Sequence, residues 1–130
     1  MNEVLEFLND CGTFFIATVE GDQPRVRPFG FAMEHEGKIC FATSNQKPVF
    51  QQLSANPKVE ISASKNGQWL RLCGNAVSCT TLESKTKALE IMPNLKNMYS
   101  AEDTIFEIFS LENAVASIFS FQGDNKTINL

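Results

Sequence analysis

The pattern of apolar and polar positions in the first part of the chain predicts a short helix followed by a pair of strands. Apolar residues from Val4 to Leu8 recur at helical spacing, and Gly12 follows them at a position where helices commonly end. Residues 13–20 are rich in β-branched and aromatic side chains, and a Gly-Asp turn separates them from a second strand predicted at 25–34. We therefore expect an N-terminal helix and a β-hairpin.

The middle of the chain continues this alternation of strands and short helices. A third strand is predicted at residues 38–43, and the proline after the next polar stretch predicts the first turn of a helix over 48–55. An Asn-Gly pair, the strongest short hairpin signal in the sequence, joins strands predicted at 58–64 and 68–79. Most of the sheet should therefore be antiparallel.

The last third of the chain predicts one further helix and two closing strands. A helix over 81–91 begins at a threonine cap and is broken by Pro93, and strands follow at 105–111 and 115–121. The polar residues 123–130 predict a loose tail, to which we assign no role.

Many short strands in hairpins, with few and short helices between them, are typical of a mainly β fold. A parallel sheet would need a helix after almost every strand, so the pattern predicts a closed or nearly closed antiparallel barrel. The length of 130 residues, with 43% hydrophobic and 20% charged residues, is that of an ordinary globular protein. We expect one domain over residues 1–130.

The charge and the hydropathy of the chain narrow its range of partners. A net charge of −4 argues against nucleic acid, because affinity for polyanions depends on an excess of Lys and Arg. No apolar stretch approaches the roughly 20 residues that span a bilayer, and the acidic start of the chain is unlike a signal peptide. We expect a cytoplasmic protein that binds neither nucleic acid nor membranes.

The cysteines and the single histidine do not form a familiar metal-binding or catalytic pattern. The four cysteines contain no Cys-x-x-Cys pair, and His35 is distant from them in sequence, so we assign no metal. His35 stands in a polar, turn-like segment and is expected on a surface loop. Without a Ser-His-Asp or Cys-His arrangement, we assign no catalytic residue.

Two arginines and two phenylalanines share one face of the second predicted strand. Side chains two residues apart on a strand project the same way, about 6.6 Å apart, and here this row holds Arg25, Arg27, Phe29 and Phe31. The alternate positions carry small or apolar residues that suit a packed interior: Val26, Pro28, Gly30 and Ala32. The arginine face is therefore expected outside the core, either in a ligand site or at a solvated strand edge.

Thr43, Ser44 and Lys47 stand at the junction between the third strand and the helix that starts at Pro48. Proline favours the first helical position, which makes Lys47 the N-cap, although the positive end of the helix dipole disfavours a cation there. A phosphate would remove this conflict by binding backbone N–H groups, both hydroxyls, the ammonium group and a neighbouring arginine. Gln51, one helical turn beyond Lys47, could reach the same groove. The alternative is that Ser44 caps the helix locally and that Lys47 points into water.

Three segments carry a family resemblance when they are taken in order: PRVRPFGF, ICFATSNQKPVFQQLSANPKVEIS and QWLRLCGNAV. They resemble the FMN-binding split-barrel family related to pyridoxamine 5'-phosphate oxidase, above all its short single-domain members of the nitroimidazole-resistance type. The resemblance covers residues 13–77, and the later YSAEDTIFEIFSLENAVASIFSF fits the family's last strands more loosely. It implies an antiparallel split barrel of the Greek-key type that holds FMN at the interface of a homodimer. A barrel of this size cannot enclose a flavin alone, so the second subunit would supply the other wall.

The resemblance also implies roles for individual residues. Thr43 and Ser44 would donate hydrogen bonds to FMN, and Lys47 would bind its phosphate. Gln68 and Trp69 open a strand that in this family often approaches the isoalloxazine ring from the second subunit, although Trp69 could instead pack in the barrel or the dimer. The residues that would line the flavin are Arg25, Val26, Arg27 and Pro28.

A flavin performs hydride and electron chemistry itself, which accounts for the lack of an evident catalytic acid or base. The resemblance implies an FMN-dependent oxidoreductase acting on a small molecule, with a nicotinamide or another donor supplying electrons. The substrate would stack against Phe29, Phe31 or Trp69. No histidine or tryptophan follows Trp69, so oxidation of pyridoxamine phosphate is not expected. The alternatives are a flavin-binding module without turnover and a related barrel that binds haem or a deazaflavin.

Overall fold

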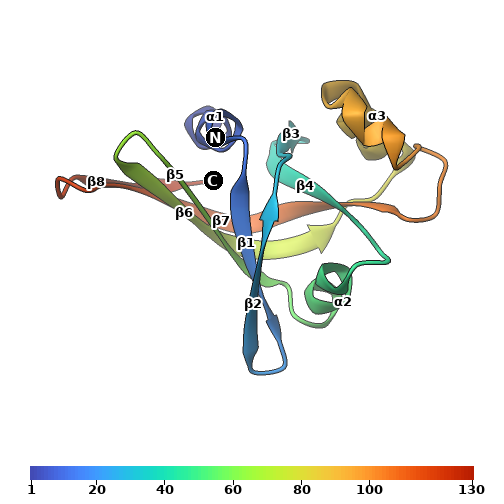
Figure 1. Ribbon diagram of the computed structural model, residues 1–130, viewed down its shortest axis with the longest axis horizontal. Helices are drawn as coiled ribbons and strands as arrows, with labels where there is room; N and C mark the ends of the chain where they lie inside the picture. Colours follow the sequence, from blue (N-terminus) through green and yellow to red (C-terminus); the bar gives the residue numbers. More distant parts are fainter.

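The chain forms one eight-stranded sheet in which every strand pairing is antiparallel, with helices packed around it (Figure 1). The computed structural model describes all of residues 1–130. The strands are β1 (Phe14–Glu20), β2 (Gln23–Phe29), β3 (Met33–His35), β4 (Lys38–Ser44), β5 (Lys58–Lys65), β6 (Gln68–Ser78), β7 (Phe106–Ser120) and β8 (Asn125–Asn129). The helices are α1 (Asn2–Cys11), α2 (Pro48–Ala55), α3 (Leu82–Ile91) and the 3-10 helix η1 (Pro93–Asn97).

The three α-helices begin and end close to where the sequence predicted. Gly12 follows α1 with a φ of 75°, a left-handed conformation that glycine adopts at little cost. Pro48 is the first residue of α2. The Thr81 hydroxyl accepts a hydrogen bond from the Ser84 N–H, and Ser84 Oγ accepts one from the Thr81 N–H, which together cap α3. No helix combines the length and the apolar character needed to cross a lipid bilayer.

The long strand predicted at 25–34 is in fact two strands, and this break shapes the sheet. β2 pairs with β1, β3 pairs with β4, and residues 30–32 between them are irregular. The strand order is β2-β1-β5-β6-β7-β4-β3, so β2 and β3 are the two edges of the sheet. Six strand spacings in a flat sheet would separate these edges by about 29 Å, whereas the four residue steps from Phe29 to Met33 reach only about 14 Å. The sheet must therefore curl into a barrel that is split between β2 and β3.

The C-terminal part of the chain differs from the prediction in two places. The strands predicted at 105–111 and 115–121 form a single strand, β7, and residues 125–129 form β8 along it instead of a loose tail. Ile128 and Leu130 pack against the core. The polar composition of the tail concealed this alternation of apolar and polar residues, which is the signature of a half-buried strand.

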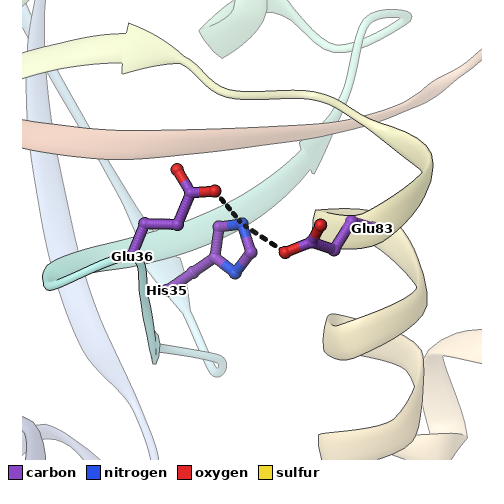
Figure 2. A group of neighbouring side chains, drawn as sticks. All are labelled: His35, Glu36 and Glu83. Carbon is purple, nitrogen blue, oxygen red and sulfur yellow. Dashed lines mark ion pairs between the residues drawn. The ribbon is translucent and has the colours of Figure 1, made fainter.

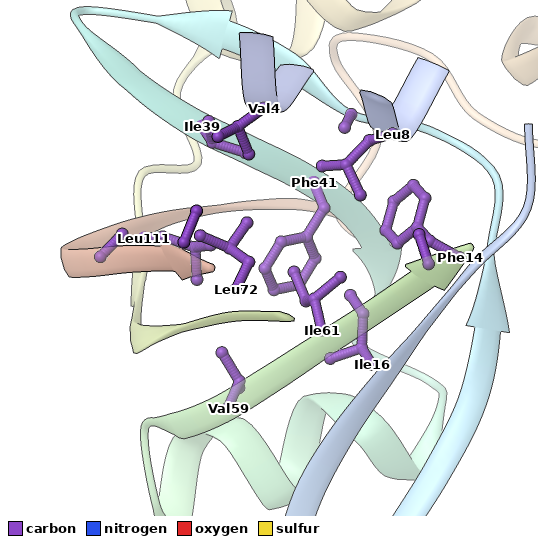
Figure 3. Close-up of a cluster of buried hydrophobic side chains, with 14 of the residues drawn as sticks. Val4, Leu8, Phe14, Ile16, Ile39, Phe41, Val59, Ile61, Leu72 and Leu111 are labelled. Atoms are coloured by element: carbon purple, nitrogen blue, oxygen red, sulfur yellow. The ribbon is translucent and has the colours of Figure 1, made fainter. Parts of the chain in front are cut away.

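The main hydrophobic core fills the barrel and is built from α1, α2 and the inner faces of the strands (Figure 3). Phe41 lies near its centre, with ring centroids 5.5 Å from Phe29 and 5.9 Å from Phe109. A second cluster lies under α3 and includes Phe31 and Phe106. Phe29 packs against the first cluster and Phe31 belongs to the second, so the phenylalanines on either side of Gly30 are fixed in different cores.

Candidate functional site

A cavity of about 260 Å³ lies between the end of β2, the end of β4, the start of α2 and the segment from Met92 to Tyr99. Of the residues predicted to bind a cofactor, the structure brings four together here: Arg27, Pro28, Thr43 and Lys47. Phe29 and Phe31, expected near a substrate, also line it. The lining contains two cationic side chains and no acidic one, so the cavity suits an anionic ligand with an apolar part.

Arg27 is held in the wall of the cavity by neutral oxygen atoms alone. Its Nη1 donates to the Ile16 carbonyl at 3.0 Å and to Thr18 Oγ1 at 2.9 Å, and its Nη2 donates to Gln52 Oε1. Burial, and after it the repulsion of Arg25, lowers the pKa of Arg27 below its ordinary value. These contacts fix the orientation of the Arg27 guanidinium but do not neutralise its positive charge. An anion in the cavity would therefore stabilise it.

The predicted arrangement of faces on β2 is wrong for most of its residues. Val26 is 66% exposed, and Pro28 and Gly30 are also exposed, whereas only Ala32 of the residues expected in the interior is buried. Arg27 and Phe29 of the arginine row face the barrel instead: Arg27 donates to Ile16 and Thr18 of β1, and Phe29 packs against Phe41 in the core.

Arg25 stands apart from the other arginine of this row. It is exposed, pairs with Glu20 at 2.9 Å and does not line the cavity. Arg25 and Arg27, which were predicted on one face of the strand, therefore have different surroundings in the structure.

The junction between β4 and α2 contributes a cation and an unpaired hydroxyl. Lys47 is the N-cap of α2, as predicted, and no side chain caps the helix. Thr43 Oγ1 is the one buried side-chain oxygen or nitrogen in the chain that has no hydrogen-bond partner. A buried hydroxyl without a partner costs about 1–3 kcal/mol, and a ligand oxygen in the cavity would remove that cost. These features fit the phosphate and the polar chain of a flavin nucleotide.

Ser44 does not line the cavity, and its hydroxyl is engaged locally. Ser44 Oγ accepts a hydrogen bond from the Gln46 N–H at 3.1 Å. The alternative that Ser44 caps α2 is wrong, because no side chain caps this helix, and Lys47 lines the cavity rather than only meeting water.

Gln52, and not the predicted Gln51, is the α2 glutamine that contacts a residue of the cavity wall. Gln51 is exposed and lies with Lys47 in a shallow groove beside the cavity. Gln52 is buried and binds Arg27, a contact that the sequence analysis missed. Only knowledge of the helix rotation relative to β1 could have distinguished the two neighbours.

Gln68 and Trp69 lie at the start of β6 and do not line the cavity of their own chain. The Trp69 ring stacks on Phe119 with centroids 4.3 Å apart, and the Arg71 guanidinium lies 6.0 Å from the Trp69 ring. Within one chain, Trp69 therefore packs against Phe119 of the barrel, as the alternative prediction stated. Gln68 and Trp69 could contact a ligand only in the cavity of another copy of the chain.

The fourth wall of the cavity was missed altogether. It consists of Met92, Leu95, Met98 and Tyr99, in and around η1. Tyr99 stacks on Phe106 with centroids 4.5 Å apart, and burial, followed by the nearby Asp103 carboxylate, raises the pKa of its hydroxyl. The apolar residues of this segment give no sign in the sequence of which surface they cover.

A sequence model of one family, described as pyridoxamine 5'-phosphate oxidase, matches residues 1–111 of the chain. The chain is similar to the crystal structure of a NimC/NimA family protein from Clostridium acetobutylicum, with 47% identity, a TM-score of 0.93 and coverage of 98% of this chain and 93% of that one. The comparison with curated proteins found no match.

Two more distant structures share the fold. General Stress Protein 26 from Bacillus anthracis is 16% identical with a TM-score of 0.74, over 97% of each chain. A heme binding protein from Mycobacterium smegmatis is 14% identical with a TM-score of 0.75, over 96% of this chain and 56% of that one. At these identities the likeness concerns the fold alone.

Proposed function

The chain belongs to the pyridoxamine 5'-phosphate oxidase family, and on this premise we propose that it binds FMN and acts as a flavin-dependent oxidoreductase on a small molecule. The observation that carries the proposal is a cavity with two cations, no acidic residue and a buried hydroxyl without a partner. The phosphate would be held by Arg27, Lys47 and the N-terminus of α2, and Thr43 would donate to a ligand oxygen.

The protein's own residues would bind and orient the cofactor. A bound flavin supplies the hydride and electron transfer. Phe29, Phe31 and Tyr99 would exclude water from one side of its ring system, and Arg27, fixed by Gln52, would set the position of the phosphate end. A nicotinamide is the proposed electron donor, and no residue is assigned a catalytic proton transfer.

We further propose that a second copy of the chain completes the site. A cavity of about 260 Å³ is smaller than the roughly 300–1,000 Å³ of pockets that enclose small ligands. Gln68 and Trp69, which cannot serve their own cavity, would face the partner's flavin. The outer face of the β1–β2 hairpin supports such a contact, because all of its paired positions are apolar: Phe15 with Pro28, Ala17 with Val26, and Val19 with Pro24.

The test is a titration of flavin-free protein with FMN and, separately, with riboflavin, which lacks the phosphate. We expect Arg27→Ala and Lys47→Ala to weaken FMN binding by about 1–3 kcal/mol, roughly 5- to 150-fold, and to change riboflavin binding little. Lys58→Ala, which removes an exposed lysine that does not line the cavity, is the matched control. Equal losses for both ligands, or unchanged FMN affinity in both variants, would place the phosphate elsewhere.

Turnover separates the oxidoreductase from a flavin-binding module. Rapid reduction of the bound flavin by NADH or NADPH, followed by reoxidation with oxygen or a nitroaromatic compound, is the expected result. Tight FMN binding without reduction would favour the module. A visible spectrum of the purified protein distinguishes flavin from haem, whose common axial ligand, histidine, is absent from the cavity.

A further inference from the structure

Three side chains of types that can ligate metals, His35, Glu36 and Glu83, lie together outside the cavity (Figure 2). His35 ends β3, Glu36 follows it in the turn to β4, and Glu83 lies in the first turn of α3. Their ligand atoms all lie within 4.8 Å of one another. The expectation that His35 is a surface-loop residue is wrong, because its side chain is only 8% exposed.

The His35 ring is directed at two carboxylates but is hydrogen-bonded to neither. Its Nε2 lies 3.9 Å from Glu36 Oε1 and 4.0 Å from Glu83 Oε1, and both distances exceed those of hydrogen bonds. Zinc binds nitrogen and oxygen ligands at about 2.0–2.2 Å, which places tetrahedral ligand atoms about 3.4 Å apart. The two glutamate side chains, 77% and 78% exposed, are free to move by the roughly 0.5–1.4 Å that this spacing requires, while the buried ring stays in place.

No lysine or arginine neutralises this pair of carboxylates. The ion pairs of Glu36 and Glu83 involve only His35, while the lysine on the neighbouring turn of α3, Lys87, pairs with Glu34 at 3.4 Å. Two carboxylates at this separation repel each other unless a cation lies between them.

We propose that His35, Glu36 and Glu83 bind a divalent transition-metal ion, with Zn²⁺ the best fit. One imidazole nitrogen and two carboxylate oxygens are ordinary zinc ligands, and water would fill the remaining position. The ion would join the β3–β4 turn to the N-terminus of α3. Because α3 leads directly into η1, the bound ion would also stabilise the wall of the cavity from Met92 to Tyr99. The site needs no flavin and stands independently of the proposed function.

The test is zinc binding by flavin-free protein that has been stripped with a chelator and returned to neutral pH. We expect saturable binding of one Zn²⁺ per chain and a higher melting temperature with Zn²⁺. Glu83→Gln and His35→Gln should weaken binding at least tenfold and abolish the thermal shift. Glu83 is exposed, so its variant should fold normally and carries the test even if the buried His35→Gln does not fold.

Two controls identify the ligands. Glu34→Gln removes a carboxylate from the same strand and should leave zinc affinity unchanged. Cys79→Ser should also have no effect, and the Co²⁺-loaded protein should lack a thiolate-to-metal charge-transfer band. The proposal is overturned if zinc does not bind saturably, if Glu83→Gln binds it as tightly as the unaltered chain, or if a cobalt–thiolate band appears.

Discussion

The side-chain oxygen of Gln52 accepts hydrogen bonds from both Arg27 and Thr18. Through this one atom, a buried residue of α2 fixes a cation on the neighbouring edge strand. The same helix presents its N-terminus and Lys47 to the cavity. The position of α2 and the orientation of the guanidinium are therefore coupled, and a ligand bound between them would depend on both.

The neighbouring glutamines offer a matched test of this contact. Gln52→Leu should lower the free energy of unfolding by about 1–3 kcal/mol, because it leaves N–H groups of Arg27 and the Thr18 hydroxyl without their acceptor. Gln51→Leu changes an exposed side chain of the same size and should stay within about 0.5 kcal/mol. Urea denaturation of both variants measures the difference. Equal stabilities would mean that Gln52 does not hold the arginine in solution.

Thr43→Val should move stability and ligand affinity in opposite directions. The buried Thr43 hydroxyl has no partner in the free protein, so replacing it by a methyl group of similar shape should be neutral or stabilise the fold by up to about 1 kcal/mol. FMN affinity should fall by about 0.5–1.5 kcal/mol, the usual contribution of a neutral hydrogen bond. Thermal unfolding of the flavin-free variant and an FMN titration give the two values. A destabilised variant with unchanged FMN affinity would contradict the proposed ligand contact.

The sequence predicted the local elements well, because their signals are local. The capping threonine of α3, Pro48 at the start of α2 and the Asn-Gly turn between β5 and β6 act over a few residues, and each lies where it was expected. β8 was missed because only pairing with β7 and the partial burial of Ile128 turn a polar tail into a strand.

The candidate site could be predicted only in part. Lys47 and Thr43 were found because a helix start and its flanking hydroxyls are visible in sequence. Which face of β2 points inward depends on the curl of the whole sheet, so Val26 was wrongly expected in the interior. The wall around Tyr99 depends on how α3 and η1 return across the barrel, which no local pattern encodes.

Asp103 anchors the loop between this wall and β7, and it should make stability depend on pH. Burial alone would raise the pKa of Asp103, but hydrogen bonds from the backbone N–H groups of Phe106, Ser100 and Ile105, together with Lys85, outweigh it and hold the pKa below 3.8. A carboxyl group whose pKa is lowered by folding stabilises the fold above its unfolded pKa, and this contribution is lost as the pH falls through the folded pKa.

Asp103→Asn should therefore destabilise the fold at neutral pH by about 1.5–3 kcal/mol, the scale of hydrogen bonds to a charged group. The difference from the unaltered chain should shrink as the pH is lowered from about 5 to below the folded pKa. Urea denaturation across this range measures it, with Asp22→Asn in an exposed turn as the control. A difference that stays constant down to acid pH would show that the charge of Asp103 is not what matters.

Val26→Asp tests whether a second copy completes the site. Val26 is 66% exposed in the single chain, so a surface aspartate there should change the stability of an isolated chain by no more than about 0.5 kcal/mol. In the proposed homodimer the same change buries a charge in an apolar contact, so sedimentation should show a shift toward monomer and FMN should bind more weakly. Leu82→Asp is the matched control, since Leu82 is also exposed but begins α3, where an acidic residue is favourable. If the Val26→Asp protein keeps both its oligomeric state and its FMN affinity, the outer face of the β1–β2 hairpin is not the interface. The second wall of the cavity would then have to come from a different surface of the chain.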